Sequence, residues 1–186
     1  MNFIGSLDLS VLLALFAMRD QGTVQLFIWI SELGSTMVIG GLAVCAALLF
    51  ASRGRLTYLA GLIMSVVGSA ATVFILKEII HRARPDALYQ AYAETDFSFP
   101  SGHATMSLAL YGFLAYVLWN TLSSKVWRIV AVLGLGLLIA LISFSRLYLG
   151  VHYLSDVAGG LVIGSFFLSL AVFTSERLWR TTTIFR

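Results

Sequence analysis

Cysteine, proline and charged residues are all scarce in this sequence of 186 residues. It contains 1 Cys and 2 Pro, and Asp, Glu, Lys and Arg together make up 11% of the chain. With Cys45 alone, an intramolecular disulfide is excluded and a cysteine-based metal site is disfavoured, so we expect this residue to serve packing. The net charge of +3 gives no basis for a nucleic-acid partner.

What the sequence has instead is hydrophobic residues. They make up 59% of the chain, and the mean hydropathy of +0.92 lies outside the range of soluble globular domains. The chain is therefore predicted to be an integral membrane protein. Its start lacks the basic segment of a secretory signal, and Asp8 interrupts the first apolar stretch, so no cleaved signal is expected.

Five charge-free stretches have about the 17 to 25 residues that a helix needs to cross a bilayer. They cover residues 33–52, 56–76, 104–124, 129–145 and 157–175. Gly160 with Gly164, and Gly134 with Gly136, predict close packing between these helices. The predicted fold is an all-α membrane bundle, with residues 1–186 forming a single domain.

The segment before these spans is different. Asp8 and the Arg19-Asp20 pair divide residues 3–31 into apolar pieces too short to cross a bilayer, which predicts two interfacial helices. The alternative is a sixth span within residues 3–18, which would move the N-terminus to the other side of the membrane.

Five spans place residues 77–103 and 146–156 on one side of the membrane. The opposite side carries a single acid, Glu176, and an excess of bases, which is typical of the cytoplasmic face. These bases are Arg53, Arg55, Lys125, Arg128, Arg177, Arg180 and Arg186. The side with residues 77–103 is therefore predicted to face outward.

Charged residues gather at the outward ends of the spans, where they indicate function because charge inside a bilayer costs about 2.5 to 3.5 kcal/mol. Lys77 and Arg84 are separated by two helical turns, so they share a face if their helix continues to Pro85. Pro85 disfavours helical geometry at Arg84, which we place at the helix end. Both cations are then predicted to bind one anion.

A turn at Pro100-Ser101-Gly102-His103 precedes an apolar, helical run. The free backbone N–H groups at the start of such a helix form a cradle for phosphate, with Ser101 and Gly102 in contact with it. His103, on the first turn, is placed to give a proton to a leaving oxygen, and the Ser101 hydroxyl to donate a hydrogen bond.

The third group is Ser145-Arg146 followed by His152 and Asp156. The last two lie four residues apart, so the carboxylate can hold one imidazole nitrogen and leave the other free to attack phosphorus. We predict His152 as the nucleophile, oriented by Asp156, and His103 as the acid. The phosphate oxygens are expected to be neutralised by Lys77, Arg84 and Arg146.

Together, Lys-(six)-Arg-Pro, Pro-Ser-Gly-His and Ser-Arg-(five)-His-(three)-Asp resemble the tripartite motif of the type 2 phosphatidic acid phosphatase superfamily. The resemblance covers residues 77–156. It implies a site at the outer membrane edge, a phosphohistidine on His152, and no metal or other cofactor. Similar proteins act on phosphatidic acid, phosphatidylglycerol phosphate or undecaprenyl diphosphate, and by analogy the chain belongs in a bacterial inner membrane.

Alternative functions share some of these features. A lipid phosphotransferase would use the same intermediate, and a soluble haloperoxidase the same motifs, although the hydrophobicity disfavours the latter. An anion transporter would need polar residues along several spans, which are nearly all apolar here. The head group and the oligomeric state are left open by the sequence.

Several polar or aromatic residues near the motifs are given no role in the chemistry. His81 and Arg82 lie between motif positions, and we expect neither to be catalytic. We expect solvated loop acids at Glu78, Asp86, Glu94 and Asp96, and interfacial anchors at Tyr89, Tyr92, Phe97 and Phe99.

Overall fold

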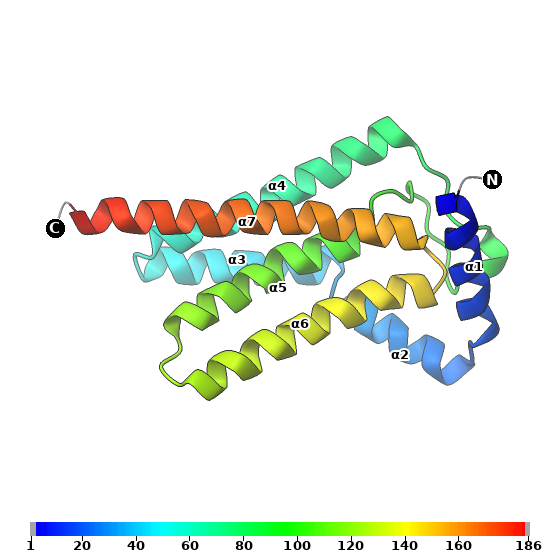
Figure 1. Ribbon diagram of the computed structural model, residues 1–186, viewed down its shortest axis with the longest axis horizontal. Coiled ribbons are helices and arrows are strands. Elements are labelled where there is room, and N and C mark those ends of the chain that lie inside the picture. Colours follow the sequence, from blue (N-terminus) through cyan, green and yellow to red (C-terminus); the bar gives the residue numbers. More distant parts are fainter. Residues whose placement is uncertain (1–2, 185–186) are drawn as a thin grey trace.

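The computed structural model describes residues 3–184, and the side chains of residues 3–178. Every regular element in that range is helical, as the sequence predicts, and the elements form one bundle (Figure 1). Arg186 and the Arg180 side chain, which were counted in the charge argument, lie outside the described part. The elements are α1 (Phe3–Ala17), α2 (Gln21–Glu32), α3 (Thr36–Ser52), α4 (Leu56–Ile80), η1 (Ala87–Tyr89), α5 (Gly102–Thr121), α6 (Lys125–Tyr148) and α7 (Leu154–Ile184).

The middle of the bundle is α5, which packs against α4, α6 and α7 (Figure 1). Its residues Ala104, Leu110 and Phe113 are fully buried, whereas large apolar side chains on the outer helices are exposed, for example Phe74, Leu133 and Val162. An exposed apolar surface of this extent matches the hydrocarbon of a bilayer. The chain is a multi-pass membrane protein.

Each of the five stretches predicted to span overlaps one helix from α3 to α7, although residues 33–35 precede α3 and residues 122–124 follow α5. Judged by length and composition, four helical segments of the described chain are long and apolar enough to cross a bilayer. They are Gln21–Ser52, Leu56–Ile80, Lys125–Tyr148 and Leu154–Leu178. The first of these contains two helices, because α2 ends at Glu32 and α3 begins at Thr36. The central helix α5 is less apolar because small and hydroxyl residues form much of its buried surface.

The N-terminal residues form two short helices, as predicted, and these lie at the end of the bundle near the α6–α7 connection (Figure 1). Helix α1 has 15 residues, a length of about 22 Å that falls short of a hydrocarbon core of about 30 Å. A sixth span is therefore disfavoured. Asp20 begins α2 by accepting hydrogen bonds from the backbone N–H groups of Gly22 and Thr23.

The predicted end of α4 is wrong. The helix stops at Ile80, and His81 follows in the left-handed conformation with φ 49°. Arg84 is thus four residues beyond the helix and shares no helical face with Lys77. The helix therefore ends five residues before Pro85, and proline is not what ends it. Residues 81–101 fold over the end of the bundle, where they contact the connection between α6 and α7.

Two glycines allow α7 to approach α5 closely. A Cβ atom at Gly160 would lie 2.7 Å from the Ser101 carbonyl oxygen, and one at Gly164 would lie 2.9 Å from that of Thr105. The predicted close packing is confirmed for this pair. It is wrong for Gly134 and Gly136, because a Cβ there would meet nothing within 4 Å.

Candidate active site

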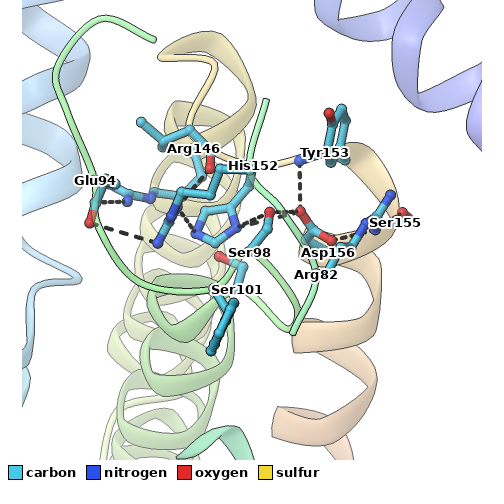
Figure 2. Close-up of polar contacts among 12 residues, drawn as sticks. Arg82, Glu94, Ser98, Ser101, Arg146, His152, Tyr153, Ser155 and Asp156 are labelled. Atoms are coloured by element: carbon cyan, nitrogen blue, oxygen red, sulfur yellow. Dashed lines mark hydrogen bonds and ion pairs between the residues drawn. The ribbon is translucent and has the colours of Figure 1, made fainter. Parts of the chain in front are cut away.

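Three segments that are far apart in sequence meet at one end of the bundle. They are the loop after α4, the start of α5, and the α6–α7 connection (Figure 2). A cavity of about 580 Å³ is lined at this end by motif residues from all three segments. The motif residues in its wall are Lys77, Arg84, Gly102, His103, Arg146 and His152.

The imidazole of His152 lies between two groups of opposite charge, and Figure 2 shows Asp156 on one side of the ring. Its Nδ1 atom is 3.6 Å from Oδ2 of Asp156, and its Nε2 atom accepts a hydrogen bond of 3.2 Å from Nη1 of Arg84. Burial, with a smaller contribution from Arg146 and Arg84, outweighs the opposing effect of Asp156 and lowers the pKa of His152 to about 4. At neutral pH the ring is uncharged, with its Nε2 lone pair toward the cations.

Asp156 lies on the first turn of α7 and is fully buried. Its Oδ2 atom accepts hydrogen bonds from the Ser98 hydroxyl and, at 2.9 Å, from the Tyr153 backbone N–H. Its Oδ1 atom accepts a hydrogen bond from Arg82. With both oxygens held in this way, the carboxylate has a fixed orientation toward the imidazole.

The cations are held by backbone and side-chain oxygens. Lys77 donates to the Phe97 carbonyl at 2.6 Å, and Arg84 to the carbonyls of Val151 at 2.6 Å and Asp96 at 2.9 Å. The guanidinium of Arg146 is only 1% exposed and donates to Ser31 at 2.7 Å. These bonds fix three positive charges around one end of the cavity, an arrangement that suits a phosphate group.

Two loop acids are paired with these cations, so the expectation of purely solvated acids is wrong for them. Asp96, 54% exposed, pairs with both Lys77 and Arg84. Glu94 lies 2.6 Å from Nη2 of Arg146 and 3.7 Å from that of Arg84. Partial burial raises the pKa of Asp96, but its bonds with Lys77 and Arg84 outweigh this and bring the pKa to about 2. Glu78 and Asp86 are exposed, as expected.

The start of α5 faces the same cavity. Ser101 is fully buried at the N-terminal cap, and its backbone N–H donates to the Asp156 carbonyl at 3.0 Å. Its hydroxyl, like Nε of Arg146, is buried without a hydrogen-bond partner. A buried polar atom without a partner calls for an explanation, and Arg146, unlike Ser101, lines the cavity where a ligand could contact it. Gly102 and the partly buried His103 line the cavity just after it.

Residues 57–180 match the PAP2 superfamily. The chain belongs to this superfamily. The resemblance noted for the three motifs is therefore confirmed, and the motif residues of a PAP2 protein meet here at one end of the bundle.

Individual PAP2 proteins show how far the similarity extends. Phosphatidylglycerophosphatase B of Bacillus subtilis is 38% identical over 108 residues, which are 57% of this chain and 52% of that protein. This chain thus spans about half the length of that relative. An undecaprenyl-diphosphatase of Sulfolobus acidocaldarius is 29% identical over 153 residues, 79% of this chain and 68% of that protein.

A solved structure extends the likeness to nearly the whole chain. The crystal structure of a transmembrane PAP2 type phosphatidylglycerolphosphate phosphatase from Bacillus subtilis matches with a TM-score of 0.85 and 30% identity. The match covers 95% of this chain and 88% of that one.

Sequence reasoning missed four polar side chains of this PAP2 site. Arg82 pairs with Asp156, and Asp8 pairs with Arg82. Ser98 donates to Asp156, and the Tyr92 hydroxyl accepts from Arg146, so the interpretation of Tyr92 as a membrane anchor is wrong. The charge of Asp8 within an apolar helix was the one available signal. Within the described residues, no three His, Cys, Asp or Glu side chains gather as a metal site would need.

Proposed function

We propose that this chain hydrolyses a phosphate ester or diphosphate on a membrane lipid, with His152 as nucleophile. The observation that carries the proposal is the position of His152, whose Nε2 lone pair faces Arg84. His152 lines the same cavity as Lys77 and Arg146. A neutral imidazole beside three cations suits attack on an anionic phosphorus centre.

The rest of the cavity wall supports a lipid substrate. It is built from apolar side chains of α3 and α4, including Ile39, Val66, Val73 and Phe74. Phe74 is 67% exposed on the outer surface of the bundle. A lipid can therefore approach from the side, with its acyl or prenyl chain against these residues and its phosphate at the charged end.

The reaction proceeds in two steps. Burial, together with Arg146, His152, Arg84 and Lys77, lowers the pKa of His103 to about 2, and a bound phosphate anion opposes these charges and favours the protonated ring. Nε2 of His152 forms a bond to phosphorus while the bond between phosphorus and the lipid oxygen breaks, and His103, protonated beside the phosphate, gives its proton to that oxygen. Asp156 stabilises the proton on Nδ1. His103 then removes a proton from water, the water oxygen attacks phosphorus, and the N–P electron pair returns to His152 as phosphate leaves.

The paired acids Glu94 and Asp96 indicate how phosphate binds. Their carboxylates contact the same guanidinium and ammonium groups that we assign to the substrate. A phosphate group that enters takes over these contacts, since it offers more charge and more acceptor oxygens in the same space. The unpaired Nε of Arg146, which lines the cavity, then gains an acceptor.

The relatives favour a substrate class. Similarity to proteins named phosphatidylglycerophosphatase and undecaprenyl-diphosphatase supports phosphatidylglycerol phosphate first and prenyl diphosphates second. The bases at the opposite end support a location in a bacterial cytoplasmic membrane with the site outside. Since α1 and α2 pack on α6 and α7, we propose that residues 1–186 act as one domain.

Phosphate release by the purified chain in detergent tests the proposal. We expect release from phosphatidylglycerol phosphate, phosphatidic acid or undecaprenyl diphosphate, and none from a soluble sugar phosphate at the same concentration. His152→Ala provides the blank. Lipid hydrolysis by the unchanged chain that does not exceed this blank would contradict the proposed function.

A further inference from the structure

Helix α1 contributes a buried carboxylate to the region behind His152. Asp8 has a side chain only 4% exposed, and it is the one charged residue of α1. Its oxygens accept hydrogen bonds from the Ser155 backbone N–H at 2.9 Å and the Ser155 hydroxyl at 2.6 Å. Its third partner is Nη2 of Arg82, at 2.8 Å. A buried carboxylate is stable only with such partners.

Arg82 joins this carboxylate to Asp156. One terminal nitrogen, Nη2, binds Asp8, and the other, Nη1, binds Oδ1 of Asp156 and, at 2.7 Å, the Ser155 hydroxyl. The guanidinium also lies over the Tyr153 ring, 4.7 Å from its centroid. A planar fork with two separate nitrogens suits two carboxylates, which a lysine ammonium would hold less rigidly.

The charges in this network are unequal. One guanidinium faces two carboxylates, and the imidazole of His152 lies on the other side of Asp156. Burial lowers the pKa of Arg82, but its bonds with Asp8 and Asp156 outweigh this and raise it above the ordinary value. Arg82 therefore stays charged, and its charge is shared between Asp8 and Asp156.

We infer that Arg82, held in place by Asp8, is a positioning residue that sets both the orientation of Asp156 and the share of its negative charge that acts on His152. The inference rests on the proposed function, in which His152 attacks phosphorus. Arg82 is not in the cavity wall, so it acts through Asp156 and not on the substrate. Helix α1, which lies outside the matched residues 57–180, thereby becomes part of the catalytic apparatus.

The kinetic consequence separates positioning from substrate binding. Arg82→Gln should lower kcat about tenfold, while KM changes by less than about twofold. Tenfold is the lower end of the loss seen when a residue that orients a metal-bound histidine is replaced, and Arg82 orients His152 in a comparable way through Asp156. Arg82→Lys should recover part of this loss because it keeps the charge. Asp8→Asn should also lower kcat. The double variant Asp8→Asn with Arg82→Gln should have nearly the same kcat as Arg82→Gln alone.

A second readout needs no substrate. The chain has 3 histidines, so NMR of histidine-labelled protein can follow His152 during a pH titration. Arg82→Gln should raise the pKa of His152, because the full charge of Asp156 then acts on the ring. Asp8→Asn should lower it, because Arg82 then pairs with Asp156 alone. A role limited to anchoring α1 would lower the melting temperature without shifts of opposite sign.

Glu78→Gln is the matched control, because Glu78 is an exposed acid four residues before Arg82. It should leave kcat and the His152 titration unchanged.

If the Arg82 and Asp8 variants both keep the wild-type titration, the positioning role is wrong, whatever the activity. If the titrations shift as expected but the unchanged chain hydrolyses no lipid phosphate, the proposed function fails and the coupling to His152 remains. Should either variant not fold, the other must still shift the His152 pKa in the direction stated, and Arg82→Lys serves as the milder replacement for Arg82→Gln.

Discussion

Arg84 donates a hydrogen bond of 3.2 Å to Nε2 of His152. A guanidinium has no acceptor, so this nitrogen carries the lone pair and the ring proton is on Nδ1, toward Asp156. The same residue thus binds phosphate oxygens and keeps the nucleophilic nitrogen unprotonated in the proposed reaction.

The two histidines should respond differently to the leaving group. His152→Ala removes the nucleophile and should abolish hydrolysis of every substrate. His103→Ala should lower kcat by about 10²- to 10⁴-fold for a lipid alcohol, because the departing oxygen then lacks its proton donor. With an aryl phosphate, whose leaving group needs no proton, the loss should be much smaller. Steady-state kinetics with both substrates measures this, and an equal loss for both would contradict the role of His103.

Activity should fall on the acid side as His152 becomes protonated. Burial lowers the pKa of His152 to about 4, and only the neutral ring can attack phosphorus. The value of kcat/KM should therefore be independent of this group at neutral pH and decrease as pH drops through about 4. A pH profile in detergent, with folding checked by circular dichroism at each pH, tests this. An acid limb centred near 6.5 would show that the ring is not buried as described.

Asp96→Asn should strengthen the binding of inorganic phosphate and vanadate several-fold. Asp96 pairs with Lys77 and Arg84, so a bound anion has to replace its carboxylate, and a neutral amide competes less. Inhibition constants for both anions measure the effect. Asp86→Asn is the control, because Asp86 is exposed in the same loop and asparagine can replace it as the cap of η1. Weaker anion binding in Asp96→Asn would indicate that the carboxylate does not compete.

Gly134 and Gly160 both lie inside helices, but replacing each with alanine should change stability in opposite directions. At Gly160 the added Cβ lies 2.7 Å from the Ser101 carbonyl, so Gly160→Ala should push α7 from α5 and cost about 1 to 3 kcal/mol of stability. At Gly134 nothing lies within 4 Å, so Gly134→Ala should be neutral or stabilise α6 by up to about 1 kcal/mol. Thermal unfolding in detergent compares them. A lower melting temperature for Gly134→Ala than for Gly160→Ala would contradict the packing described.

Much of the fold was predictable because it depends on properties that are local in the chain. The lengths of the apolar stretches set α3 to α7, and the charged pair Arg19-Asp20 separates the first two helices. The three motifs identified the superfamily, since their spacing is readable without coordinates. They also named residues that the structure gathers around one cavity.

Only the tertiary structure decided how the charges pair. Asp8 and Arg82 are 74 residues apart, and no local pattern shows that one carboxylate on an apolar helix meets a guanidinium in a loop. The same holds for Glu94 and Asp96, which look like solvated acids until the loop folds over the bundle and brings them to Arg146, Lys77 and Arg84. Helix α4 ends at Ile80, and that early end puts Arg82 within reach of Asp156. Ion pairing depends on distance in space, and the three-dimensional path of the loop sets that distance.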